Sequence, residues 1–483
     1  MNFKMMGRFI AQIVAIEAAF MIPALAISLG YGEWAAVKAF AITLGVMLAL
    51  AGLFYALCRR AGKLFGAREG LVCVALSWMV MSLLGALPFV LCGQVPNYID
   101  ALFEIVSGFT TTGASVIANV EGLYKGILYW RSFSHWIGGM GVLVFLLAIL
   151  PSGGGSGFTM HLLRAESPGP DVGKLVPKMR QTAVILYVIY ICLTVLNVIF
   201  LLFGKMHWLH ALCTAFGTAG TGGFGVFNDS LGSVNPYIQN VTTVFMFLFG
   251  INFSCFYLLL LGKFRSVFKD EELRLYIGLA VVSIAAIVLS IRPIYATLEE
   301  TIRHAAFQVS SIMTTTGYTT TDYDLWPAFP KAILLMLMMV GACAGSTGGG
   351  LKCIRVLLLF KVLRRNIRQI LNPRKVLVVR SNDKVVDEKV LANTNAYFAA
   401  YVIILVICTL VLSLDGFSLE TNLSAAIATF NNIGPGMAAV GPTCNFAAYG
   451  VLSKLTMCLA MLAGRLEIFP ILILLSRGTW KRK

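Results

Sequence analysis

The sequence predicts an all-α polytopic membrane protein with four parallel helix–pore-loop–helix repeats, fourfold pseudo-symmetry around one pore, and two extra N-terminal transmembrane helices. Of its 483 residues, 58% are hydrophobic and only 12% are charged, whereas soluble domains carry about 25% charged residues. The apolar runs continue for about 20 residues, as in membrane-crossing helices, and do not alternate as in a β-barrel. Short apolar segments that end in glycine recur roughly every hundred residues, which indicates an internal repeat.

The first two spans are expected within residues 9–29 and 34–57. Ala24-Leu25-Ala26 resembles a signal-peptidase site, but Glu17 interrupts the long apolar run before it, which favours an uncleaved span. The net charge of +16 comes largely from Lys and Arg clustered in alternate loops. The positive-inside rule explains this pattern better than a nucleic-acid partner does. Both termini are therefore predicted to be cytoplasmic.

Each repeat is expected to contain an outgoing span, a short re-entrant segment with a glycine loop, and a returning span, which brings the total to ten spans. Since all four repeats have the same orientation, their symmetry axis should stand along the membrane normal. The outgoing spans are predicted near residues 70–92, 182–203, 274–292 and 394–414, and the returning spans near 127–150, 237–262, 330–360 and 449–476. The units are the N-terminal spans 1–69 and the repeats 70–180, 181–273, 274–393 and 394–483.

The re-entrant segments are candidates for an ion-selective filter. The stretches 101–110, 209–218, 305–314 and 423–430 can each form a helix of about 15 Å, half the bilayer. Each would point its C-terminal end, the negative end of the helix dipole, at the centre, where it favours a cation. Main-chain carbonyls of the following loop could then replace the water shell of that cation. The filter is predicted at Thr111, Thr112 and Gly113; Gly220, Thr221 and Gly222; Thr315, Thr316 and Gly317; and Asn432, Ile433 and Gly434.

The alternative is that these are ordinary Gly/Thr loops at helix junctions. Irregular backbone at membrane depth must be buried in protein or line water. Glycine at the turn permits backbone angles and close approaches that a Cβ would forbid. One such loop would be weak evidence, but four in register between spanning helices favour a filter.

The chain resembles the TrkH-type subunits of the Trk/Ktr/HKT potassium transporter superfamily over essentially its whole length. The resemblance implies an inward potassium pore in a bacterial inner membrane, a homodimer, and a cytoplasmic TrkA-like nucleotide-binding regulatory ring. Potassium is then the substrate, and no covalently bound cofactor or transition metal is expected. Glycine at all four turns fits the potassium-selective pattern. The segments that carry the resemblance, besides the loops, are residues 134–141, 165–170, 250–254, 344–350 and 431–436.

Two loops depart from the family pattern. The second is richer in glycine, around Gly220 and Gly222, where the family more often has serine. The fourth has Asn431, Asn432 and Ile433 in place of threonines. Both departures leave open the relative selectivity among K+, Rb+ and Na+. The sequence also does not determine a coupling to H+ or Na+, or the regulating nucleotide.

A gate is predicted in the third returning span, which a glycine run interrupts. Several glycines in an apolar helix cost about 1 kcal/mol each relative to alanine, and such a break is tolerable only beside a cavity. Charges at this depth are usually functional. Alternatively, Lys352 could snorkel to the interface and Arg465 could pair with Glu467 for packing. The candidate gate consists of Gly345, Ser346, Thr347, Gly348, Gly349 and Gly350, with Lys352 and Arg465 as positive charges that oppose cations.

Two other functions are the alternatives to a potassium pore. An ion-coupled secondary transporter of another cation or small solute should have polar contacts at broken helices and would not need four equivalent loops. A membrane-embedded enzyme is disfavoured because the sequence contains no HExxH, Walker-type or aspartate-rich motif. The basic segment 361–389 sets topology and offers a surface for a cytoplasmic partner.

Overall fold

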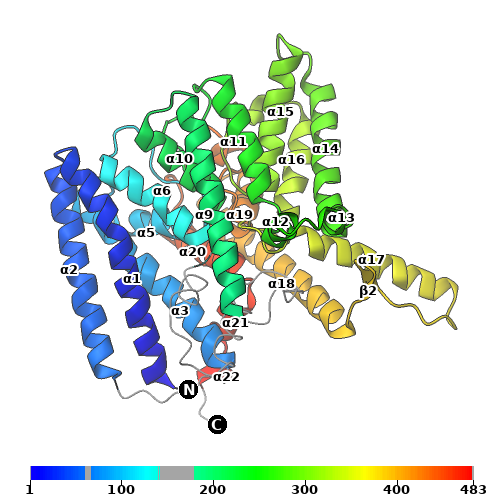
Figure 1. The fold of residues 1–483 in the computed structure, drawn as a ribbon, viewed down its shortest axis with the longest axis horizontal. Coiled ribbons are helices and arrows are strands. Elements are labelled where there is room, and N and C mark those ends of the chain that lie inside the picture. Colours follow the sequence, from blue (N-terminus) through cyan, green and yellow to red (C-terminus); the bar gives the residue numbers. More distant parts are fainter. Residues whose placement is uncertain (1, 60–66, 140, 142–178, 481–483) are drawn as a thin grey trace.

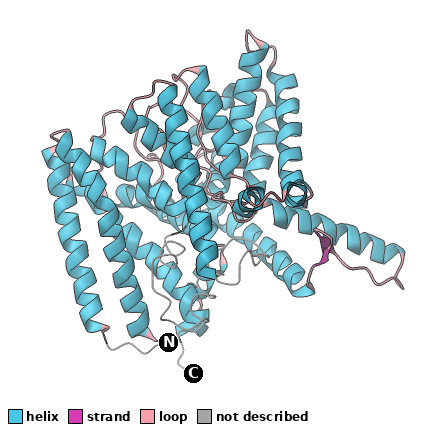
Figure 2. Ribbon diagram, viewed as in Figure 1, coloured by secondary structure: helices cyan, strands magenta, loops and turns pink. Residues whose placement is uncertain are grey.

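The computed structural model describes residues 2–59, 67–139, 141 and 179–480, and helices dominate this part of the chain (Figures 1 and 2). The predicted segment 165–170 and the end of the first returning span lie outside these residues. The only strands in the described ranges are β1 (Arg380–Ser381) and β2 (Lys384–Val385), which pair antiparallel.

The two N-terminal helices, α1 (Phe3–Gly30) and α2 (Trp34–Leu57), form an antiparallel pair at one side of the molecule (Figure 1). The Asn2 side chain accepts a hydrogen bond from the Met5 amide and so caps the start of α1. Helix α1 packs against α3 (Ala67–Gly85) and α6 (Lys125–Gly139) of the first repeat, and α2 packs against α4 (Leu87–Leu91). The pair is thus attached to the first repeat through both helices, while much of α2 faces outward.

The outgoing helices agree closely with the sequence-based expectation. They are α3 (Ala67–Gly85) with its continuation α4 (Leu87–Leu91), α9 (Met179–Phe203), α14 (Glu271–Ile291) and α18 (Glu388–Leu412). Together with α1 and α2 they account for the six described helices that are long and apolar enough to cross a membrane. The protein is therefore a multi-pass membrane protein.

The second and fourth returning elements are not the uninterrupted spans that the sequence predicts. Only the third was expected to break, yet the second bends by 91° between α11 (Pro236–Phe249) and α12 (Phe253–Leu260). There the Asn252 side chain accepts from the Ser254 amide and starts a new helix. The fourth breaks between α20 (Val451–Arg465) and α21 (Phe469–Leu475), where Glu467 and Ile468 have φ of 62° and 64°.

The third returning element divides into α16 (Ala328–Val340) and α17 (Cys353–Leu371), as expected, and the first begins as α6 (Lys125–Gly139). Helix α17 projects away from the body and leads to the β1–β2 hairpin (Figure 1). The remaining short helices are α13 (Phe264–Phe268), η1 (Tyr323–Leu325), η2 (Ser413–Asp415), η3 (Ala438–Val440) and α22 (Arg477–Trp480).

Four short helices lie inside the bundle at the predicted re-entrant positions. Each starts with a side-chain cap, from Asn97, His207, Thr297 or Ser418, which orders its first turn. Each is largely buried, because it packs against helices of its own repeat and of a neighbouring repeat. We call them the pore helices: α5 (Tyr98–Phe109), α10 (Trp208–Gly220), α15 (Leu298–Met313) and α19 (Leu419–Phe430).

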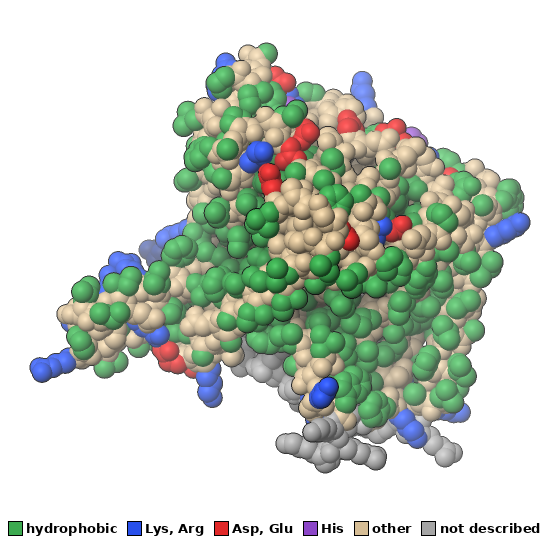
Figure 3. All heavy atoms as spheres, turned by 180° about the vertical axis from the view of Figure 1, so that it is seen from behind, with side chains coloured by type: hydrophobic (Ala, Val, Ile, Leu, Met, Phe, Trp, Pro, Cys, Tyr) green, Lys and Arg blue, Asp and Glu red, His purple; other side chains and the backbone are tan. Residues whose placement is uncertain are grey.

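The surface matches this architecture. Hydrophobic side chains cover the broad outer face, and acidic side chains gather toward the end opposite the two termini (Figures 1 and 3). Lys and Arg are prominent on the projecting α17 and its hairpin. An apolar belt between differently charged ends is the surface that a bilayer requires.

Candidate ion-binding site

All four pore helices end in the same backbone motif. Thr111, Thr221, Thr315 and Asn432 have left-handed φ of 56°, 55°, 59° and 55°. In each loop the next amide donates a 2.8 Å hydrogen bond to a carbonyl in the last turn of the helix: Thr112 to Ser107, Gly222 to Gly217, Thr316 to Ser311 and Ile433 to Ala428. This is the Schellman arrangement, which closes a helix while turning the chain sharply.

The glycine that follows in each loop approaches the next loop around an axis. Gly113, Gly223, Gly317 and Gly434 all have positive φ, between 73° and 103°. A Cβ on these residues would lie 2.0 Å from the carbonyl oxygen of Gly222, 1.9 Å from that of Thr316, 1.9 Å from that of Ile433 and 2.7 Å from that of Thr112, respectively. Each loop thus contacts the next loop in the sequence, and the fourth loop contacts the first. This closed ring presents main-chain carbonyls and has no room for a side chain.

The structure corrects the expected register of the second loop. The sequence-based expectation aligns Gly220–Gly222 with Thr111–Gly113, but in the structure Thr221–Gly223 occupies the equivalent place. Gly220 is instead the last residue of α10, and a Cβ there would lie 2.2 Å from the His135 carbonyl oxygen. The run Gly220-Thr221-Gly222-Gly223 allows either alignment by sequence. The shared hydrogen bonds and left-handed Thr221 select one.

A cavity of about 100 Å³ lies against the ring. All four ring glycines line it, together with main chain and side chains of the segments that follow each loop. Arg131 is the one charged residue of its lining. A small, partly open space that ends on four converging loops is the form of a vestibule beside an ion site.

Sequence analysis missed the buried ion pair that braces this vestibule. Arg131 Nε lies 2.5 Å from Glu104 Oε1, and both side chains are at most 2% exposed. Arg131 also donates to the Gly225 carbonyl at 3.0 Å, and its guanidinium lies 3.7 Å from the centre of the Phe224 ring. Glu104 accepts from the Val116 amide at 3.0 Å. The pair therefore joins the first loop to the second. An arginine inside the aromatic run 127–136 was the available signal.

His135 also connects the first repeat to the second loop. The Phe224 amide donates to His135 Nε2 at 3.3 Å, so the Nδ1 proton is donated to the Gly108 carbonyl at 2.8 Å. A ring that accepts at one nitrogen and donates at the other is neutral. His135 thus holds the C-terminal part of α5 and the second loop at a defined separation.

The expected gate segment lies directly against the pore helices' ends. Between Gly341 and Lys352 the chain is irregular and buried, and the Gly349 amide donates to the Thr315 hydroxyl at 2.6 Å. A Cβ on Gly348 would lie 2.9 Å from the Thr314 carbonyl oxygen, and one on Gly349 would lie 2.5 Å from that of Asn431. Glycines in this segment therefore permit close packing beneath the third and fourth loops.

Both cationic side chains proposed for the gate contact this region. Lys352 is 3% exposed and donates to the Gly348 carbonyl, so its ammonium does not extend to the interface. Arg465 donates to the Thr347 carbonyl at 2.8 Å and to the Gly139 carbonyl at 2.7 Å. Arg465 therefore connects the irregular segment with the end of α6.

Glu467, which the sequence suggests as a partner for Arg465, has a different ion-pair partner. Glu467 forms an ion pair with Arg355 in the first turn of neighbouring α17. The Arg355 guanidinium also lies 3.9 Å from the centre of the Tyr397 ring. The break between α20 and α21 is thereby attached to the start of α17.

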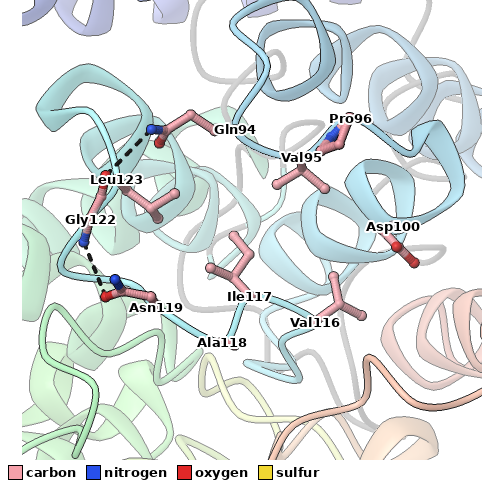
Figure 4. A pocket seen from close by; sticks show the side chains of 10 residues that line it. All are labelled: Gln94, Val95, Pro96, Asp100, Val116, Ile117, Ala118, Asn119, Gly122 and Leu123. Atoms are coloured by element: carbon pink, nitrogen blue, oxygen red, sulfur yellow. Dashed lines mark hydrogen bonds between the residues drawn. The ribbon is translucent and has the colours of Figure 1, made fainter.

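A larger pocket, of about 390 Å³, lies in the first repeat, and none of the four ring glycines lines it (Figure 4). Asp100 is its acidic residue, but Lys454 Nζ lies 2.6 Å from the Asp100 carboxylate. The side chain of Gln94 donates to the Gly122 carbonyl at 3.4 Å across the rim. Since its one carboxylate is already paired, this pocket does not compete with the ring as a cation site.

Comparisons with known proteins agree with this architecture. The family model for TrkH, described as a cation transport protein, matches residues 36–478. The Trk system potassium uptake protein TrkH of Salmonella typhimurium is 36% identical over 488 residues, covering 100% of both chains. The Trk system potassium uptake protein TrkG of Escherichia coli is 32% identical over 467 residues, covering 95% of each.

The fold also matches a solved structure. The crystal structure of the potassium transporter TrkH from Vibrio parahaemolyticus superposes with a TM-score of 0.88 at 32% identity and covers 100% of both chains. The family model spans most of the chain, and relatives align with the chain over its whole length. Both comparisons therefore indicate the same family. The chain belongs to the TrkH family of cation transport proteins.

Proposed function

We propose that this protein carries potassium into a bacterial cell, with the ring of four loops as its selectivity filter. The filter consists of Thr111–Gly113, Thr221–Gly223, Thr315–Gly317 and Asn432–Gly434. Its support is the closed series of close approaches, in which a main-chain carbonyl of one loop lies against the glycine of the loop before it. Such carbonyls replace the hydration shell of a potassium ion. The assignment of potassium as the transported ion rests on the relatives, which are named potassium uptake proteins.

The gate is the irregular segment that contains Gly345–Gly350, held in a closed position beneath the filter. Lys352 and Arg465 place two fixed positive charges beside the path, which raises the electrostatic barrier to a cation. Their bonds to the Gly348 and Thr347 carbonyls support this assignment. Conduction then requires the segment and its charges to move.

The orientation follows the basic loops, so the termini and the α17 projection are cytoplasmic in the inner membrane. The protein forms a homodimer, and a TrkA-like nucleotide-binding ring binds the basic projection. The binding of the ring at this projection is supported by the Gly345–Gly350 segment, which leads directly into α17. A movement of that helix would reach the gate without passing through another element.

Cation flux through purified protein in lipid vesicles tests the function. We expect K+ and Rb+ to pass faster than Na+, and expression to restore growth of a potassium-uptake-deficient bacterium at low potassium. A pH gradient applied to the same vesicles separates a channel from an ion-coupled transporter. Uptake of a different solute, with no potassium flux from protein shown to be inserted, would overturn the proposal.

A further inference from the structure

Glu272, at the start of α14, links the two ends of the gate segment. Its side chain is buried, 6% exposed, on the side of α14 that faces this segment. Its Oε1 accepts from the Ala344 amide at 2.6 Å and from the Ile354 amide at 3.1 Å. Ala344 precedes the glycine run, and Ile354 follows Lys352. One carboxyl oxygen therefore holds both the entrance and the exit of the segment.

The bond to Ile354 takes the place of a helix cap. Helix α17 begins at Cys353, and Lys352 before it has φ of 74° and provides no side-chain cap. The first amides of a helix have no partner within that helix, and they favour a negative group. Glu272 provides that group from a different helix, so the start of α17 depends on the position of α14.

The residues before Glu272 contact the cytoplasmic hairpin. The Glu271 amide donates to Asn382 Oδ1 at 2.9 Å, and the Asn382 amide donates to Glu271 Oε2 at 3.1 Å. Asn382 Nδ2 also donates to Asp270 Oδ2 at 2.9 Å. Lys361 of α17 adds an ion pair to Glu271 at 2.5 Å. Three consecutive acidic residues thus connect the hairpin turn, α17 and the gate segment.

We propose that Glu272 is the positioning residue that keeps the gate segment closed, and that Asp270–Glu272 transmits movement of the β1–β2 hairpin to it. Pulling Asn382 away from Asp270 and Glu271 shifts the start of α14. That shift removes the acceptor from Ala344 and Ile354, and both ends of the segment are released together. This inference rests on the gate assignment under the proposed function.

Two natural cysteines report on the segment without any flux measurement. Cys343 and Cys353 are at its two ends and are 1% and 0% exposed, while Cys73 in α3 is 0% exposed and distant in sequence. The full-length protein in vesicles is treated with N-ethylmaleimide, and the labelled cysteines are identified by mass spectrometry. The variant Glu272→Met keeps the approximate size of the side chain and removes the acceptor. Glu272→Gln keeps one acceptor oxygen.

For Glu272→Met we expect at least a threefold faster labelling of Cys343 and Cys353, with Cys73 unchanged, and at least a threefold higher potassium flux without a partner. Glu272→Gln should lie between this variant and the wild type. Asn382→Ala should change both readouts in the same direction, and its effect should add little in the double variant, because both changes break the same connection. Glu420→Gln, at a 56% exposed side chain in α19, is the control and should change neither.

Equal acceleration of Cys73 would indicate general loosening and overturn the inference, as would unchanged labelling and flux in Glu272→Met. If Glu272→Met does not insert, Asn382→Ala alone decides, since its side chain lies outside the bundle. The proposed function is tested separately by the wild type. If the variants label faster but the wild type does not conduct potassium, the positioning role of Glu272 stands and the proposed function is refuted. If the wild type conducts potassium but the variants behave like it, the proposed function stands and the positioning role is refuted.

Discussion

The Gly349 amide donates a 2.6 Å hydrogen bond to the hydroxyl of Thr315, which connects the irregular segment of the third repeat to the loop that follows α15 of the same repeat. Both groups are buried. A buried amide that loses its acceptor costs about 1–3 kcal/mol. The state of the segment and the conformation of the third loop are therefore energetically linked.

Replacing Thr315 by valine should weaken this connection. Valine keeps the shape but removes the acceptor, so we expect a loss of about 1–3 kcal/mol in the closed arrangement and a higher potassium leak without a partner. Flux in vesicles and thermal unfolding measure the two effects. Thr315→Ser retains the hydroxyl and should behave like the wild type, and equal leak in both variants would contradict this explanation.

The corrected register of the second loop predicts that Gly223→Ala abolishes potassium flux. The added Cβ would lie 1.9 Å from the Thr316 carbonyl oxygen, and φ of 73° is unfavourable for alanine. Gly278→Ala in α14 is the matched control, because no atom lies within 4 Å of its added Cβ. The control should conduct normally and gain up to about 1 kcal/mol of helix stability. Normal selectivity in Gly223→Ala would refute the ring.

Arg465→Ala should raise the basal potassium flux. The change removes the donors to the Thr347 and Gly139 carbonyls and one positive charge beside the path. Arg465→Lys keeps the charge, but a single ammonium cannot reproduce the planar set of donors. If charge alone blocks the path, lysine restores a low flux. If the bonds to both segments matter, lysine leaks as well, and a low flux in Arg465→Ala would argue against any gating role.

Arg131→Met should destabilise the protein strongly. It leaves the buried Glu104 carboxylate without its ion-pair partner, which costs about 3–5 kcal/mol. Thermal unfolding of detergent-purified protein measures the loss, and adding Glu104→Gln to the same chain should recover part of it. The pair Arg303–Glu299, whose carboxylate side chain is 63% exposed, provides the contrast, since Glu299→Gln should cost no more than about 1 kcal/mol. Similar losses at the two sites would contradict the bracing role.

The sequence alone determined the elements whose signals are local. The pore helices α5, α10, α15 and α19 follow from apolar segments too short to cross a bilayer, each ended by a turn with glycine nearby. Continuous apolar runs placed the outgoing helices in the same way. The break before α17 was visible because several glycines stand together in an otherwise apolar helix.

Only the tertiary structure decided the rest, because the deciding contacts join distant parts of the chain. The register of Thr221–Gly223 depends on the next loop around the ring, and glycine-rich sequence permits more than one alignment. Glu467 pairs with Arg355 rather than with the nearer Arg465. Glu272 reads as an ordinary acidic residue at a helix start until Ala344 and Ile354 are placed beside it. Hydrogen bonds between remote segments leave no periodic pattern in either partner, so they emerge only when the chain is packed.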